Sequence, residues 1–320
     1  MNSDTKDDVI VVGGGVIGLT TAVVLAEGGR RVRVWTRDPV ERTTSAVAGA
    51  LWWPYRIEPP EAARGWALRS LDVYEELAER PEVTGVRLVE GVMGETDLDE
   101  TDSWAAGRLK GLRVATPEEY AGPVGLWARL PLVDMSTHLP WLRERLAAAG
   151  AVVEERTVSA LAEADAPVVV NCTGLGAREL VPDASVRPVR GQLVVVENPR
   201  IPTWIVSKDA SGGMAYVFPH PGRLVLGGTS EEDVWSTAPD PAVAEAIVRR
   251  CAALRPEIAG ARVLDHRVGL RPVRDAVRLE RELLPDGRVL VHNYGHGGAG
   301  VTVAWGCAEE AAGLADPAAF

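Results

Sequence analysis

The sequence predicts an α/β fold in two domains, one holding a parallel sheet and the other an α+β domain on a mostly antiparallel sheet. Two observations carry this prediction. The apolar runs VIVVGGG and VVVNCTG pass directly into glycine-containing turns, which is typical of buried strands in a parallel sheet. The later stretch AYVFPHPGRLVLGG reads instead as short strands joined by turns. A chain of 320 residues is also long enough for two domains.

The N-terminal segment predicts a βαβ unit. Residues 9–12 read as a strand, 16–28 as a helix and 31–35 as a second strand. The uncharged run that begins at Val9 contains glycines and threonines and follows acidic residues, so we expect folded structure there and no membrane span.

A glycine pattern lies between that first strand and helix. Gly13, Gly15 and Gly18 form GxGxxG, in which bare backbone lets a pyrophosphate approach the helix N-terminus. The pattern predicts a Rossmann-like dinucleotide-binding domain, with Asp38 after the second strand holding a ribose hydroxyl. Arg37 beside it would suit the 2′-phosphate of NADP, so FAD and NAD(P) both remain open at this point.

The rest of the chain alternates between the two domains. A helix is expected around 65–80 and another around 139–149, and residues 168–174 read as a buried strand that ends in a Thr-Gly turn. A last strand, VLVHNYG, leads into a helix over 301–314. The expected boundaries are 1–55, 140–185 and 265–320 for the first domain, and 56–139 and 186–264 for the second.

Composition excludes several classes of partner. A net charge of -11 with only three lysines disfavours nucleic acid. Cys172, Cys251 and Cys307 lie far apart without a CxxC spacing, so we expect no disulfide framework, no metal site and a cytoplasmic protein.

Several motifs occur in the order in which one known family has them. They are the N-terminal glycine turn, VAGALWWPY (47–55), RGQ (190–192), AYVFP (215–219), GLRPVRDAVRLERE (269–282) and HNYGHGGAG (292–300). With them the chain resembles the D-amino-acid oxidase family, whose relatives include the D-aspartate and glycine oxidases. The resemblance implies non-covalent FAD and oxidation of a D-amino acid to a 2-oxo acid, ammonia and hydrogen peroxide. A hydride would pass from the α-carbon to flavin N5, and dioxygen would reoxidise the flavin.

The resemblance also implies roles for particular residues. Arg271 would bind the substrate carboxylate through its planar fork, the Tyr216 hydroxyl would assist it, and the Gly298 carbonyl would accept an amine hydrogen. From residue types alone, Arg271 could equally belong to a salt-bridged surface with Arg274, Arg278 and Arg281. The expected pocket wall comprises Leu51, Trp53, Tyr55 and Phe218.

No titratable base is needed for hydride transfer, so we expect His292 and His296 to support a loop whose backbone approaches the flavin. The helix that starts near Val301 would direct its dipole at the flavin. The residues expected to bind the cofactor are Gly13, Gly15, Val16, Ile17, Gly18, Arg37, Asp38, Thr43, Thr44, Ser45, Ala48, Gly49, Ala50, Leu51, Val158, Cys172, Thr173, Gly174, Arg271, His296, Gly297, Gly298, Ala299, Gly300, Val301 and Thr302.

Two departures from the family pattern bear on the substrate. Residues 211–214 replace a longer lid and contain no tyrosine, which predicts a more open pocket and product release less limited by lid opening. Trp53 stands where some members have glutamine, which favours neutral, apolar or aromatic D-amino acids over D-aspartate. A homodimer is possible. The alternatives are a D-aspartate or glycine oxidase, an NAD(P)-dependent dehydrogenase and a non-enzymatic nucleotide-binding or redox-sensing protein.

Overall fold

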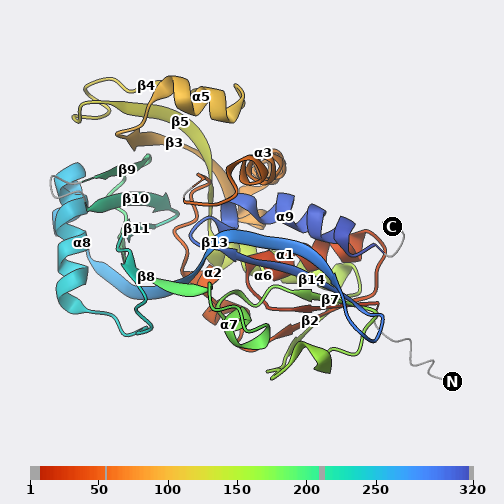
Figure 1. The fold of residues 1–320 in the computed structure, drawn as a ribbon. Helices are drawn as coiled ribbons and strands as arrows, with labels where there is room; N and C mark the ends of the chain where they lie inside the picture. The colour runs from red at the N-terminus through yellow and green to blue at the C-terminus, as the bar shows by residue number, and fades with distance from the viewer. Residues whose placement is uncertain (1–7, 55, 209–212, 317–320) are drawn as a thin grey trace.

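The computed structural model describes residues 8–54, 56–208 and 213–316, and within them the strands form one 14-stranded sheet (Figure 1). Its order is β4-β5-β3-β9-β10-β11-β8-β13-β14-β7-β1-β2-β6, with β12 paired to β8. The strands are β1 Val9–Val12, β2 Val32–Thr36, β3 Val86–Gly94, β4 Arg113–Val114, β5 Gly125–Val133, β6 Val152–Glu155, β7 Val168–Asn171, β8 Arg187–Glu197, β9 Trp204–Lys208, β10 Met214–His220, β11 Arg223–Gly227, β12 Glu231–Glu232, β13 Val263–Leu283 and β14 Val289–His296.

The parallel part of the sheet consists of β14, β7, β1, β2 and β6. Every residue of β1, β7 and β14 is buried, in keeping with their apolar runs. Helices α1 (Val16–Glu27), α6 (Met135–Ala148) and α9 (Gly300–Leu314) lie along one side of this part (Figure 1). The predicted βαβ unit is therefore confirmed.

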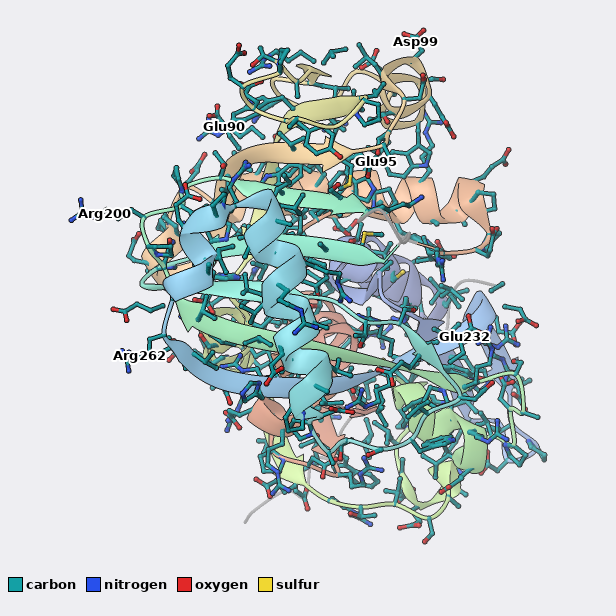
Figure 2. All side chains as sticks on the ribbon, turned by 90° about the vertical axis from the view of Figure 1, so that its left-hand side faces the viewer. Glu90, Glu95, Asp99, Arg200, Glu232 and Arg262 are labelled. Carbon is teal, nitrogen blue, oxygen red and sulfur yellow. The ribbon has the colours of Figure 1, made fainter. Side chains whose placement is uncertain are left out.

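The other strands pair antiparallel, except that β3 runs parallel to β9. Helix α8 (Pro241–Leu254) crosses one face of them (Figure 2), where its Ile247 and Cys251 pack in a core cluster with Val194 of β8 and Leu226 of β11. The opposite face of β8 is therefore free of α8, because side chains alternate along a strand.

The expectation of a separate antiparallel sheet is wrong in one respect. Strand β13 is 21 residues long; its first part pairs with β8 and its second part with β14, with a register shift between Val273 and Arg278. One strand thus belongs to both parts, and hydrogen bonding continues across the whole sheet.

Two helices begin earlier than expected. Helix α3 spans Pro60–Leu77 rather than 65–80, because Pro60 takes the first helical position, where a missing N–H costs nothing. Helix α6 begins at Met135 rather than near 139, because the Asp134 carboxylate caps it by accepting from the Ser136 backbone N–H. The remaining α-helices are α2 Thr44–Val47, α4 Pro81–Thr84, α5 Leu98–Ala105 and α7 Ala177–Leu180, and 3₁₀ turns occupy Val40–Arg42, Leu161–Glu163, Gly174–Gly176 and Pro256–Gly260.

Within the described ranges, no helix combines the length and the apolar character needed to cross a membrane.

Candidate active site

The glycine turn after β1 packs too closely for side chains. A Cβ at Gly13, whose φ is 123°, would lie 2.3 Å from the Cys172 carbonyl oxygen, and a Cβ at Gly18 would lie 1.9 Å from the Gly13 carbonyl oxygen. Gly13 therefore brings the turn against the end of β7, and Gly18 brings α1 against the turn. The N-terminus of α1 is left with bare backbone at the carboxyl edge of the parallel strands, where ligands bind in such sheets.

The three predicted hydroxyls fix the segment around α2. The Ser45 Oγ accepts from the Val16 backbone N–H at 2.9 Å, and the Thr44 hydroxyl donates to the Leu270 carbonyl of β13 at 3.2 Å. The Thr43 hydroxyl donates to the Val40 carbonyl at 2.7 Å. This segment therefore connects the first turn of α1 to β13, the strand that carries Arg271.

Arg37 and Asp38 follow β2 at the same edge. They form an ion pair at 2.9 Å, with the Arg37 side chain 72% exposed. The Thr36 hydroxyl donates to the Asp38 carbonyl and so fixes the backbone of the turn. Arg37 thus partly neutralises the carboxylate that was expected to hold a ribose.

The other predicted residues at this edge lie in the turns after β6 and β7. Val158 is half-buried and packs with a cluster that contains Trp35. Burial raises the pKa of the Cys172 thiol to about 12, so Cys172 is neutral at physiological pH. Thr173 donates to the Asn171 side chain through its hydroxyl and its backbone N–H.

A row of glycines forms a floor on the face of the sheet away from α8. Tyr216 lies opposite Gly227 in the β10–β11 register, and Gly191 lies opposite Gly269 in the β8–β13 register. A Cβ at Gly227 would lie 2.0 Å from the Tyr216 ring, and one at Gly191 would lie 2.4 Å from the Arg271 guanidinium. Both side chains thus lie flat on bare backbone, and the registers place them on one face.

The predicted pocket residues lie above this floor. The Tyr216 and Phe218 rings stack with centroids 4.5 Å apart, and a Cβ at Gly49 would lie 2.9 Å from Phe218. Ala50 has a φ of 58°, and its carbonyl accepts from the Val133 N–H. Leu51 forms a bridge with Leu132 of β5. The structure thus brings the 48–51 segment, Tyr216 and Phe218 together; Tyr55 lies outside the described residues.

The C-terminal glycine stretch turns back onto the same site. Gly295 and Gly297 have φ values of 89° and 54°, and the Gly297 N–H donates to the Pro272 carbonyl, next to Arg271. Gly298 is exposed, and α9 begins two residues later. The Thr302 hydroxyl donates to the Trp53 carbonyl at 2.9 Å, which holds Trp53 beside the start of α9.

The two histidines of this stretch are neutral at physiological pH. Burial lowers the pKa of His296 to about 3 and also lowers that of His292. His292 contacts Asn171 at 3.3 Å and Glu282 at 3.1 Å, as expected of a support. His296 differs, because its Nε2 has no hydrogen-bond partner among the described residues and its carbonyl accepts from the Ala299 N–H.

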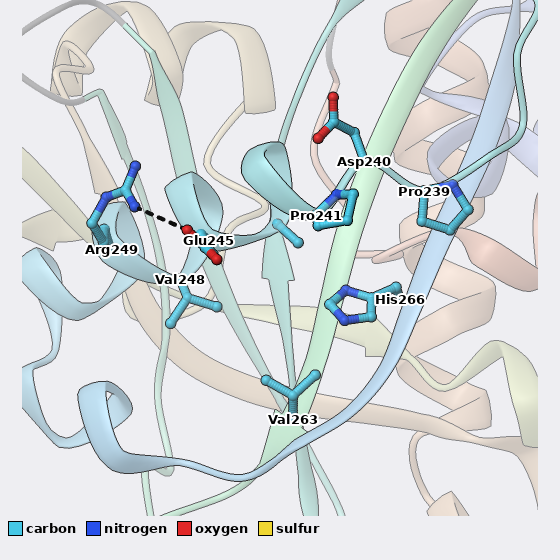
Figure 3. A pocket seen from close by; sticks show the side chains of 9 residues that line it. Pro239, Asp240, Pro241, Glu245, Val248, Arg249, Val263 and His266 are labelled. Carbon is cyan, nitrogen blue, oxygen red and sulfur yellow. Dashed lines mark ion pairs between the residues drawn. The ribbon is translucent and has the colours of Figure 1, made fainter.

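A cavity of about 470 Å³ lies elsewhere, at the start of α8 (Figure 3). Pro239, Pro241 and His266 line it, and His266 lies opposite Val194, which faces α8. The cavity is therefore on the far face of the sheet from Arg271.

Comparison with known proteins assigns the family. The family model of FAD-dependent oxidoreductases matches residues 8–314. This chain belongs to that family.

Curated relatives of this oxidoreductase narrow the assignment to the D-amino-acid oxidase branch. This chain is 77% identical to the D-amino-acid oxidase of Streptomyces coelicolor, with 98% of each chain covered. It is 50% identical to that of Rubrobacter xylanophilus, covering 97% of this chain and 96% of the relative. Glycine oxidase from Geobacillus kaustophilus has the same fold, with a TM-score of 0.80 at 23% identity, covering 97% of this chain and 94% of the other.

The residues of this oxidoreductase fit FAD. The turn from Gly13 to Gly15 presents backbone without side chains at the N-terminus of a 12-residue helix, which suits a pyrophosphate. Asp38 lies at the end of β2, where a ribose carboxylate is expected.

Sequence reasoning missed two residues that position Arg271 and Tyr216, namely Thr229 and Gly228. The Arg271 Nη1 donates to the Thr229 carbonyl at 3.0 Å. A Cβ at Gly228 would lie 2.7 Å from the Tyr216 ring, so this glycine leaves room for that ring. The signal was the pair of glycines before threonine in LVLGGTS, which interrupts a strand where bare backbone is needed.

Proposed function

We propose that this FAD-dependent oxidoreductase converts a D-amino acid, dioxygen and water to a 2-oxo acid, ammonia and hydrogen peroxide. The observation that carries the proposal is the placement of Arg271 and Tyr216 on one glycine floor, bordered by the 48–51 segment and the 297–300 turn. The names of the curated relatives, D-amino-acid oxidases at 77% and 50% identity, support the reaction.

The chain's own residues would bind and orient the substrate. The Arg271 fork would take the carboxylate in two parallel hydrogen bonds, with the Tyr216 hydroxyl as a further donor. The Gly298 carbonyl would accept from the amine, so that three contacts fix the α-carbon and direct its hydrogen. Bound FAD supplies the two-electron acceptor, which dioxygen regenerates.

No acid–base residue is assigned in this proposal. His292 and His296 are neutral and buried, and His292 is already engaged with Asn171 and Glu282. The N-terminus of α9, a 15-residue helix, instead would stabilise negative charge that develops on the cofactor.

The residues proposed to bind FAD lie at the carboxyl edge of the parallel strands. The Gly13–Gly18 turn would hold the pyrophosphate, Asp38 the ribose, and Val158 with the 172–174 turn the remaining contacts of the nucleotide. The Thr43–Leu51 segment and the His296–Thr302 segment would border the flavin. The Ser45 Oγ accepts from the Val16 backbone N–H and so holds the 43–51 segment beside the N-terminus of α1, which supports this assignment.

We propose neutral, apolar or aromatic D-amino acids as the preferred substrates. Trp53, Phe218 and Tyr216 all contact the main hydrophobic core, and they make the proposed wall aromatic. A panel that compares D-methionine, D-phenylalanine, D-aspartate and glycine tests this, and D-aspartate or glycine giving the highest kcat/KM would contradict it. The short lid segment includes Gly213 and Met214, whereas Ser211 and Gly212 lie outside the described residues; product release less limited by lid opening stays a prediction.

Location and assembly also remain proposals. We propose a cytoplasmic location because the three cysteines are free and buried, which suits a reducing compartment. A homodimer stays a prediction that light scattering tests.

The anaerobic absorbance spectrum of the purified protein tests the function. The proposal expects a yellow protein whose flavin bands bleach on addition of D-methionine and return with air. A colourless protein that binds nicotinamide cofactor would support a dehydrogenase instead. A yellow protein unchanged by any D-amino acid of the panel would contradict the proposal.

A further inference from the structure

The RGQ segment, Arg190–Gln192 of β8, lies directly against Arg271. A Cβ at Gly191 would lie 2.4 Å from the Arg271 Nη2, 2.6 Å from Cζ and 2.7 Å from Nη1. The guanidinium therefore occupies the space that any other residue at 191 would fill. Real Cβ atoms do not approach other heavy atoms so closely, so only glycine leaves the fork where it lies.

One edge of that guanidinium is held by Thr229. The Nη1 donates to the Thr229 carbonyl at 3.0 Å, and the Thr229 hydroxyl accepts from the Gln192 backbone N–H at 2.8 Å. Arg271 forms no ion pair with any described residue. A guanidinium has five N–H donors, so the Thr229 contact leaves enough for a bidentate carboxylate.

Thr229 begins a segment with little regular structure. Only β12, two residues long, pairs within 229–240. Outside β12, which pairs with Val189 and Arg190 of β8, no ladder hydrogen bonds define the position of this segment, and side chains must do so.

Arg190 and Gln192 provide those contacts from the other face of β8. Arg190, 3% exposed, donates to Glu231 at 2.6 Å and to the Ser236 and Ala238 carbonyls at 3.0 and 2.7 Å. Gln192, fully buried, donates to the Asp240 carbonyl at 2.7 Å and accepts from the Asp240 N–H at 2.9 Å. The Arg190 Nη2 also donates to the Gln192 Oε1, which joins the two side chains.

We propose that Arg190–Gln192 is the seat that positions the carboxylate-binding arginine. Gly191 leaves room for the Arg271 fork, and Arg190 is a positioning residue that fixes the 229–240 segment so that the Thr229 carbonyl orients the fork. The inference rests on the proposed function, in which Arg271 binds the substrate carboxylate. It predicts that changes in the seat weaken carboxylate binding more than they weaken cofactor binding.

Strand β8 offers a matched control for Arg190. Arg187 pairs with Glu232 at 3.1 Å, one residue along β12 from Glu231. The Arg187 side chain is 35% exposed, against 4% for Arg190, and Glu232 is its one side-chain hydrogen-bond partner among the described residues. Gly65 of α3 is the control for glycine, because a Cβ there meets nothing within 4 Å.

The test is the dissociation constant of benzoate, a carboxylate without an oxidisable α-carbon, measured on the FAD-loaded enzyme by the flavin absorbance change. Gly191→Ala and Arg190→Met should each raise the dissociation constant of benzoate about tenfold or more, because a displacement of about 1 Å in a group that positions a ligand changes affinity by this much. Arg187→Met and Gly65→Ala should stay within about twofold of wild type. FAD content and Tm are measured on every variant, and the KM for D-methionine should rise more than kcat falls.

Arg271→Leu in the same series separates the two claims. If Arg271→Leu loses benzoate affinity while Gly191→Ala and Arg190→Met keep it, the seat is wrong and the anchor stands. If Arg271→Leu binds benzoate like wild type, the proposed function of Arg271 fails. Should Arg190→Met not retain FAD, Gly191→Ala decides, because it acts on the guanidinium directly. A lower Tm with unchanged benzoate affinity in both seat variants would make the segment purely structural and overturn the inference.

Discussion

Arg271, in the first part of β13, lies in different surroundings from Arg274 and Arg278 in the second. Before Val273 the strand pairs with β8, where Arg271 lies over bare Gly191 and donates to a carbonyl. After it the strand pairs with β14, where the arginines meet acidic side chains: Arg274 contacts Asp183 at 2.9 Å and Arg278 contacts Glu280 at 2.6 Å. Arg267, also in the first part, pairs with Asp265 at 2.8 Å, so pairing with β8 does not by itself leave an arginine available; the bare backbone of Gly191 under its guanidinium distinguishes Arg271.

The second part also explains the tyrosine of HNYG. The Tyr294 hydroxyl donates to the Asp183 carboxylate at 2.7 Å and accepts from Arg278 at 2.9 Å, and its side chain is 1% exposed. Asp183, Arg274, Arg278 and Tyr294 thus form one network, which we call the Asp183 network. It ties β13 and β14 to the segment after α7, away from the glycine floor.

Asp183→Asn should have the largest effect on stability in this network. The change removes the charge that faces Arg274, whose side chain is 25% exposed, and weakens the acceptor of Tyr294. We expect a loss of about 2 kcal/mol in the free energy of unfolding, since partly buried ion pairs with further hydrogen bonds are costly to break. Differential scanning calorimetry measures it. The kcat/KM should stay within about threefold of wild type; a larger fall would mean that the network also serves the site.

Arg278→Leu should have a smaller effect of the same kind. Leucine keeps part of the packing against Tyr294 but loses the hydrogen bond to its hydroxyl and the pair with Glu280. A loss of about 1 kcal/mol is expected, because the Glu280 partner is exposed. Thermal unfolding beside the wild type checks this, with Arg262→Leu as the control, since Arg262 and its partner Glu197 are 72% and 57% exposed. Equal Tm changes in the two variants would contradict it.

Lowering the pH should reduce the difference in Tm between the wild type and Asp183→Asn. Burial opposes ionisation of Asp183, but hydrogen bonds from Ser185, Tyr294 and Arg274 outweigh it and hold its pKa below the usual value of 3.8. The unfolded chain therefore binds a proton before the folded one does. The stabilisation is fully present above about pH 5 and is lost as the pH falls through the lowered pKa. Between about pH 5 and pH 3, the Tm of the wild type should fall more steeply than that of Asp183→Asn; parallel curves would contradict the assignment.

Local patterns predicted the parallel part of the fold and the edge where its turns meet. GxGxxG, the buried runs and the terminal helix are all signals carried by neighbouring residues, and the structure has the elements where they were expected, apart from the early starts of α3 and α6. The continuity through β13 was missed, because strand length alone does not show which partners a strand has.

The sequence could not separate Arg271 from Arg274 and Arg278 by residue type. Thr229 lies 42 positions from Arg271, and Asp183 lies 91 positions from Arg274. No local pattern reports such contacts. Resemblance to a family selected Arg271; the pairing registers supply the physical reason, which is a glycine on the adjacent strand.

The most direct test is the kcat/KM for D-methionine in Arg271→Leu beside Arg278→Leu, with the FAD content of both matched to the wild type. The two changes remove the same side chain from the two parts of β13. Arg271→Leu should lose at least about 30-fold, on the order of 2 kcal/mol, because a charged bidentate contact disappears. Arg278→Leu should stay within about threefold of wild type. Near-wild-type kcat/KM in Arg271→Leu, or equal losses in both variants, would contradict the division of roles along this strand.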